Sequence, residues 1–94
     1  MRSVPPADTR SKSEIWRSRS GAKAVEAELK RLGGRLREIR ESKGWTLEET
    51  AEEAKLHAVT LSRIENGRSN VTVASLVALA RAFGVGMSDL FPPA

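Results

Sequence analysis

The sequence predicts an all-α protein, because three of its features favour helices over strands. Its apolar residues are mostly alanine, leucine and valine, and aromatic residues make up only 4% of the 94 residues. Such a composition suits helices better than a β-sandwich. Apolar residues recur every three or four positions along much of the chain, and glycines stand where such segments end. The length allows one small core and a tail, and not two separate cores.

Residues 1–21 are predicted to form a flexible basic arm. They are rich in serine, arginine and proline and show no periodicity, which is typical of segments that bury too little apolar surface to fold. Trp16 is the exception, and a single tryptophan in a polar tail indicates a small docking contact.

An apolar stripe with helical spacing begins after this arm. Its members are Val25, Leu29, Leu32, Leu36 and Ile39. The stripe passes through Gly33 and Gly34, and a glycine in a helix interior costs roughly 1 kcal/mol. We therefore expect a leading helix over residues 22–32 and a further helix over residues 34–43, with one continuous helix as the alternative.

Two short helices joined by a tight turn are predicted next. The first covers residues 47–54 and opens with a capping box, in which Thr46 and Glu49 exchange hydrogen bonds between side chain and backbone. The turn occupies residues 55–57, and the second short helix covers residues 58–66. The apolar positions of the second helix are Leu61 and Ile64. Because these lie on one face, the opposite face is free to enter the major groove of DNA.

Two more helices complete the predicted domain. One is capped by Thr72 and runs to Phe83, and a last short helix covers residues 87–91, before a tail at residues 92–94. The predicted fold is therefore a compact five-helix domain over residues 33–91, with a leading helix and a basic extension before it.

The net charge of +4 is unevenly distributed. Residues 1–31 carry eight basic and four acidic side chains, whereas residues 32–94 carry eight of each. The basic segment is either a solvated tail or an arm that contacts DNA, since excess positive charge attracts phosphate. Cysteine is absent, which suits a reducing cytoplasm. We expect no signal peptide, because the basic N-terminus has no apolar segment after it, and no membrane span, because no apolar run approaches about 20 residues.

An ordered set of short motifs runs from Leu32 to Phe91. The motifs are Gly44-Trp45-Thr46, Glu48-Glu49, Ala51, Ser62-Arg63-Ile64-Glu65-Asn66-Gly67, Ala78-Leu79-Ala80-Arg81-Ala82-Phe83-Gly84-Val85 and Asp89-Leu90-Phe91. Together they resemble the phage-repressor-like, or XRE, family of helix-turn-helix proteins over about two thirds of the chain. The resemblance implies a homodimer that reads two half-sites in double-stranded DNA, with residues 58–66 as its recognition helix.

The resemblance also implies roles for single residues. The positions that would face bases are Ala58, Val59, Ser62 and Arg63. The positions that would contact phosphate are Thr46, Leu47, Asn66, Arg68 and Asn70. The family pairs an arginine of its first helix with the glutamate that closes the recognition helix, and these residues here are Arg40 and Glu65.

Three departures from the family pattern affect this site. Leu47 stands where the family usually has a glutamine, so only its backbone N–H can bind phosphate. Lys55 replaces a turn glycine, and because a left-handed lysine costs roughly 1 kcal/mol, we expect a reshaped turn. Ala58 and Val59 would pack on thymine methyl groups, so hydrogen-bonded base readout falls mainly on Arg63. The alternative for Arg63 is a phosphate contact or an ion pair.

No arrangement of side chains predicts an enzyme, a metal site or a bound cofactor. His57 is the only histidine, and it has no evident partner for general-base catalysis or metal binding. The glutamates of residues 48–53 predict a solvated helix face, and the serines lack the histidine and aspartate companions of a nucleophile.

The sequence therefore predicts a sequence-specific DNA-binding regulator that acts as a homodimer. Candidate dimer contacts near the C-terminus are Val85, Met87, Leu90 and Phe91, and the leading helix offers Val25 and Leu29 as a rival surface. One alternative is an antitoxin-like interaction module, in which residues 1–31 bind a toxin or another partner protein. A second is a helix-turn-helix kept only as a scaffold.

Overall fold

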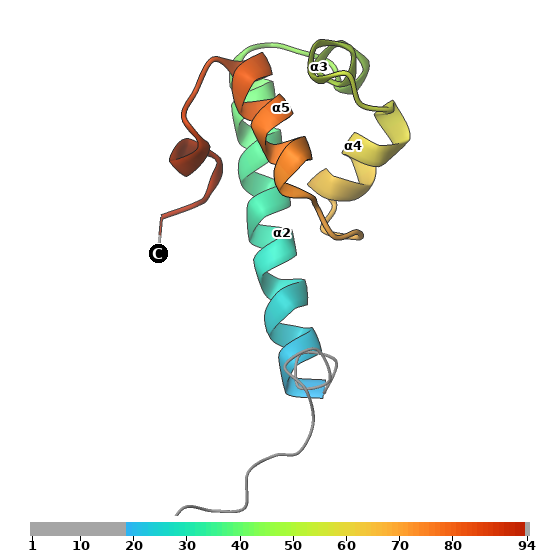
Figure 1. Ribbon diagram of the computed structural model, residues 1–94, viewed down its shortest axis with the longest axis vertical. Coiled ribbons are helices and arrows are strands. Elements are labelled where there is room, and N and C mark those ends of the chain that lie inside the picture. The colour runs from blue at the N-terminus through green and yellow to red at the C-terminus, as the bar shows by residue number, and fades with distance from the viewer. Residues whose placement is uncertain (1–18, 94) are drawn as a thin grey trace, which may run out of the picture.

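One long helix, α2 (Arg19–Ser42), supports the other elements of the molecule (Figure 1). The structure is a computed structural model that describes residues 19–93. Three shorter helices and a 3₁₀ turn follow, namely α3 (Leu47–Ala54), α4 (Ala58–Glu65), α5 (Val73–Phe83) and η1 (Met87–Leu90). The predicted all-α class is confirmed for these residues, which form four α-helices and one 3₁₀ turn and contain no strand.

The continuity of α2 settles the alternative that its two glycines left open. Residues 22–32 and 34–43 were predicted as two helices or one, and Gly33 and Gly34 both lie inside the single helix. Residues 19–21, assigned to the arm, are its first residues. Residues 1–18 lie outside the described part of the chain, and so do Trp16 and most of the segment on which the antitoxin-like alternative rests.

The core draws one fully buried leucine from each of four elements. These are Leu36 of α2, Leu61 of α4, Leu79 of α5 and Leu90 of η1. Helix α3 adds small residues instead, since Ala51 and Ala54 are buried there and let α4 and α5 approach closely. Each buried leucine stabilises the fold by about 1.5–3 kcal/mol. The core therefore holds α4 in place against α2 and α3.

The local signals at the ends of α3 behave as the sequence predicts, with one exception. The N–H of Thr46 donates to the Glu49 carboxylate at 2.9 Å, and the N–H of Glu49 donates to the Thr46 hydroxyl at 3.0 Å. The bond from the Thr46 N–H, together with the Thr46 hydroxyl, lowers the pKa of the Glu49 carboxylate below its ordinary value. The prediction of a reshaped turn was wrong, because Lys55 itself adopts the left-handed conformation with φ 57° and ψ 43°.

The C-terminal segment runs back along α2, on the side away from α4 (Figure 1). Arg35 donates from Nε to the carbonyl oxygen of Asp89 at 2.9 Å, and Arg31 donates from Nη2 to that of Pro93 at 3.0 Å. These bonds leave the two sides of α2 with different neighbours, α4 on one and the chain end on the other.

Candidate nucleic-acid interface

Helix α4 presents one side to the core and the other to solvent. Its buried residues are Leu61, Ile64 and Glu65. On the opposite side Val59 is 60% exposed, and Arg63 and Asn66 are exposed as well. A helix with an apolar inner side and an unobstructed outer side has the form that enters a major groove.

A buried ion pair fixes the end of α4 to α2. Arg40 donates from Nε to Glu65 Oε2 at 2.7 Å and from Nη2 to Glu65 Oε1 at 2.9 Å. The Glu65 side chain is 1% exposed and that of Arg40 is 12% exposed. The hydrogen bonds that Arg40 donates to Glu65 raise the pKa of Arg40 above its ordinary value. The bidentate geometry holds α4 in orientation as well as in position.

The Arg40 side chain is also bonded to the loop that precedes α3. Its Nη1 donates to the carbonyl oxygen of Trp45 at 2.9 Å. The Trp45 ring packs in turn near Phe83 of α5, with ring centroids 6.0 Å apart. All three guanidinium nitrogens therefore donate hydrogen bonds within the protein, and the group links α2, α4 and this loop.

Gly33 lets α4 approach α2 closely. A Cβ atom built on Gly33 would overlap the backbone carbonyl oxygen of Ile64 and would lie 2.5 Å from that of Glu65. In the sequence Gly33 indicates only a cost to the helix and gives no sign of this contact. The residue it meets is more than thirty positions away, so no local signal could have revealed it.

The positions expected to face bases differ in their exposure. Val59 and Arg63 point away from the core, whereas Ser62 is half-buried. Ala58 is also half-buried and packs in part against the core, so its expected contact with bases stays a prediction. It lies nearer to the inner side of α4 than Val59 does, at helical spacings of three and seven from Leu61 and Glu65.

The positions expected to contact phosphate lie at the start of α3 and at the C-terminal end of α4 with the loop that follows. Both the hydroxyl and the N–H of Thr46 are used in the capping box. In residues 19–93, no acceptor is paired with the backbone N–H of Leu47. After the C-terminal end of α4, Arg68 and Asn70 are exposed. Asn66 donates from its side-chain amide to the carbonyl oxygen of Ser62 at 2.7 Å.

No described cluster of side chains has the composition of a metal site. His57 is exposed at the N-cap of α4 and makes no side-chain capping bond. None of the described helices combines the length and the apolar character that a membrane span requires.

Comparison with known protein families identifies this arrangement of helices. A helix-turn-helix family model matches residues 36–90, which include all of α3, α4 and α5. This chain belongs to the XRE-type helix-turn-helix family. The resemblance deduced from the motifs is thereby confirmed, and the match leaves residues 19–35 of α2 outside the family's common unit.

Two relatives from this family carry names that describe transcriptional regulators. The HTH-type transcriptional regulator DdrOP3 of Deinococcus deserti is 37% identical over 60 residues, which are 64% of this chain and 46% of that protein. The chain therefore spans about half the length of this relative. An uncharacterized HTH-type transcriptional regulator, y4dJ of Sinorhizobium fredii, is 38% identical over 64 residues, or 68% of this chain and 83% of that protein.

Solved structures of the family have the same fold. The restriction-modification controller protein C.AhdI from Aeromonas hydrophila is 34% identical with a TM-score of 0.68, covering 69% of this chain and 98% of that one. The DNA-binding domain of BldD is 35% identical with a TM-score of 0.65, covering 71% of this chain and 97% of that one.

Proposed function

We propose that this protein is a sequence-specific DNA-binding transcriptional regulator that inserts α4 into the major groove. One observation carries the proposal. The inner side of α4 is held by Leu61, Ile64 and the Arg40–Glu65 pair, while its outer side is free. A rigid helix loses little conformational entropy on binding, so its contacts with bases contribute more fully to affinity.

Arg63 and Val59 are the proposed base-reading residues. A guanidinium matches the two acceptors of guanine, and a valine packs against the methyl group of thymine. Ser62 is a weaker candidate, because its side chain is half-buried. Phosphate contacts would come from the Leu47 N–H on one side of the groove and from Asn66, Arg68 and Asn70 on the other.

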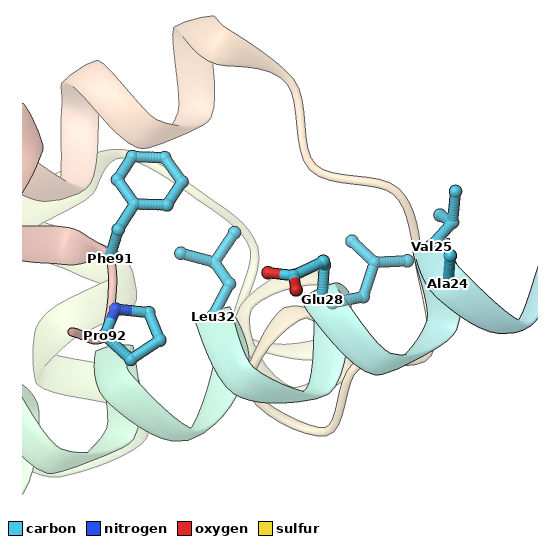
Figure 2. Close-up of a pocket in the computed structure, with 7 residues that line it drawn as sticks. Ala24, Val25, Glu28, Leu32, Phe91 and Pro92 are labelled. Atoms are coloured by element: carbon cyan, nitrogen blue, oxygen red, sulfur yellow. The ribbon is translucent and has the colours of Figure 1, made fainter. Parts of the chain in front are cut away.

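A homodimer would read a palindromic operator, and an apolar groove offers a surface on which two copies can pair. Both surfaces that the sequence suggests for a dimer contribute to it, since Val25 and Leu29 of α2 line the same groove of about 250 Å³ as Phe91 and Pro92. Figure 2 shows Phe91 and Pro92 beside Leu32, with Ala24 and Val25 farther along α2. A second copy could cover this groove without covering α4, which lies across α2 from it (Figure 1).

One residue of the predicted dimer surface is excluded from it. Leu90 is fully buried in the core, so it cannot contact a second copy. Val85 and Met87 are half-buried and pack on the core, whereas Phe91 is 48% exposed. The dimer surface that we propose therefore consists of Val25, Leu29 and Phe91.

Selection of bound duplexes from a random pool tests the proposal, and a recovered palindrome is the expected result. On the selected duplex, Arg63→Ala should weaken binding by about 1–3 kcal/mol and relax the preference at one position of each half-site. Arg81→Ala on α5 is the matched control and should change neither the affinity nor the base preference. Failure of the unaltered protein to enrich any sequence would refute the proposal.

The dimer is tested separately. Leu29→Glu or Phe91→Glu should convert the protein to a monomer in light scattering and weaken operator binding. Val73→Glu is the control, since Val73 is 69% exposed on α5 and lies outside the groove. A monomeric unaltered protein that still selects a palindrome would contradict the assigned surface.

A further inference from the structure

The loop that follows α4 rests directly on the first half of α2. Gly67 has a φ of +66°, and a Cβ atom built on it would lie 2.8 Å from both Cα and Cγ of Lys30. The loop therefore contacts α2 at Lys30. Beyond this contact α2 continues toward the N-terminus for eleven more residues, as far as Arg19.

Three basic residues of α2 follow the same side of the helix as this loop. Lys23, Lys30 and Arg37 are spaced by seven residues, which brings them to nearly the same angle around a helix. Arg37 lies at the end of α4, with Nε 3.4 Å from Glu65 Oε1. Its side chain is 48% exposed and that of Lys30 is 63% exposed. We call these three residues the basic row.

The outer part of the basic row has little to neutralise it. Lys23 and Lys30 line one shallow hollow together with Glu26 and Ala27. Glu26 lies 3.2 Å from the Lys30 ammonium, but both side chains are about 60% exposed. Exposed pairs of this kind contribute about 0–1 kcal/mol. A phosphate can therefore take the place of the Glu26 carboxylate at low cost.

The charge of the whole chain points to the same segment. Residues 36–90, the family's common unit, carry seven basic and eight acidic side chains, so they contribute no net attraction for DNA. Residues 19–31 carry four basic and two acidic side chains. The excess positive charge of residues 19–93 therefore lies on residues 19–31 of α2, the segment that includes Lys23 and Lys30.

We propose that the first half of α2 is a second contact with duplex DNA, in which Lys23 and Lys30 bind phosphates that flank the site entered by α4. This inference rests on the proposed function and extends it beyond the family's common unit, which begins at residue 36. The two lysines are separated by about 10 Å along α2, which corresponds to about three base pairs of duplex. The contact would continue the row of phosphate contacts from Arg68 onto α2.

Other side chains on this part of α2 have different partners. Arg31 donates to Glu28 at 3.1 Å and to the carbonyl oxygen of Pro93 at 3.0 Å, on the side of the C-terminal segment. It carries the same charge as Lys30 and is its neighbour in sequence. Arg31 is therefore the natural control for a loss of charge that does not face the loop after α4.

The salt dependence of DNA binding by the full chain tests the inference. Lys23→Gln with Lys30→Gln should reduce the slope of log affinity against log salt by about 0.9 for each lysine, and should weaken selected and unrelated duplexes equally. Arg31→Gln with Arg81→Gln removes the same charge and should leave the slope nearly unchanged. Equal slopes for the two double variants would overturn the inference.

A second measurement uses the length of the duplex. On a duplex that ends at the outer edge of the half-site, the two lysine substitutions should have no effect, because the flanking phosphates are missing. An effect of the same size on short and long duplexes would contradict the flanking contact. If the unaltered protein selects no duplex, the proposed function fails. If Arg63→Ala weakens binding and the lysine variants keep the slope, only the α2 contact fails.

Discussion

Gly33 of α2 lies against the backbone of Glu65, so closely that a methyl group at position 33 would stand 2.5 Å from the Glu65 carbonyl oxygen. The Glu65 side chain is bonded to Arg40, about two turns beyond Gly33 along α2. The end of α4 is therefore held at both backbone and side chain. This crossing sets how far the exposed side of α4 projects from the domain.

The adjacent glycines of α2 provide the first prediction, because they should respond in opposite directions to the same change. Gly33→Ala should lower the free energy of unfolding by about 1–3 kcal/mol, since the backbone of α4 must move. Gly34→Ala should raise it by up to about 1 kcal/mol, because nothing lies within 4 Å of the added methyl group and alanine favours helix. Thermal unfolding of the two variants measures both, and equal signs would show that the crossing is not tight.

The Arg40–Glu65 pair provides the second prediction. Glu65→Leu or Arg40→Met alone should cost about 3–5 kcal/mol, because each leaves the charge of the other residue buried without its opposite charge. The double variant Arg40→Met with Glu65→Leu should cost clearly less than the sum of the two single variants. Part of its remaining cost is the lost hydrogen bond from Arg40 to the Trp45 carbonyl oxygen. Urea unfolding of all four proteins gives the coupling energy, and additive costs would mean that the pair does not act as a unit.

The capping box gives the third prediction, on pH. The pKa of Glu49 is lowered in the folded protein, so its carboxylate stabilises the fold above the ordinary pKa of a glutamate. This contribution is lost as the pH falls through the lowered pKa. The stability difference between the unaltered protein and Glu49→Gln should therefore shrink between about pH 6 and about pH 3. A difference that does not change with pH would indicate that the ionised carboxylate contributes nothing.

Lys55 is the subject of the fourth prediction. Because this lysine has a φ of +57°, Lys55→Gly should relieve strain and stabilise the protein by about 0.5–1 kcal/mol. Lys55→Ala should give no such gain, since alanine has the same steric conflict. Calorimetry of the two variants measures this difference, and equal melting temperatures would mean that the left-handed turn stores no strain.

The sequence alone determined the helices that depend on local chemistry. The bounds of α3, the capping box of Thr46 and Glu49, and the end of α5 at Phe83 follow from residues within four positions of one another. The family motifs supplied the pairing of Arg40 with Glu65, which spacing alone does not reveal. Such features are readable because capping bonds and helical periodicity act over a single turn.

The tertiary structure alone decided which surfaces are available. Only packing shows that Ala58 packs in part against the core, that Leu90 is core and not interface, and that Lys30 lies beneath Gly67. It also gives Gly33 a reason to be a glycine, because the atoms it would strike belong to another helix. These features depend on contacts between residues far apart in the chain, and the energy of such contacts exists only once the helices have packed.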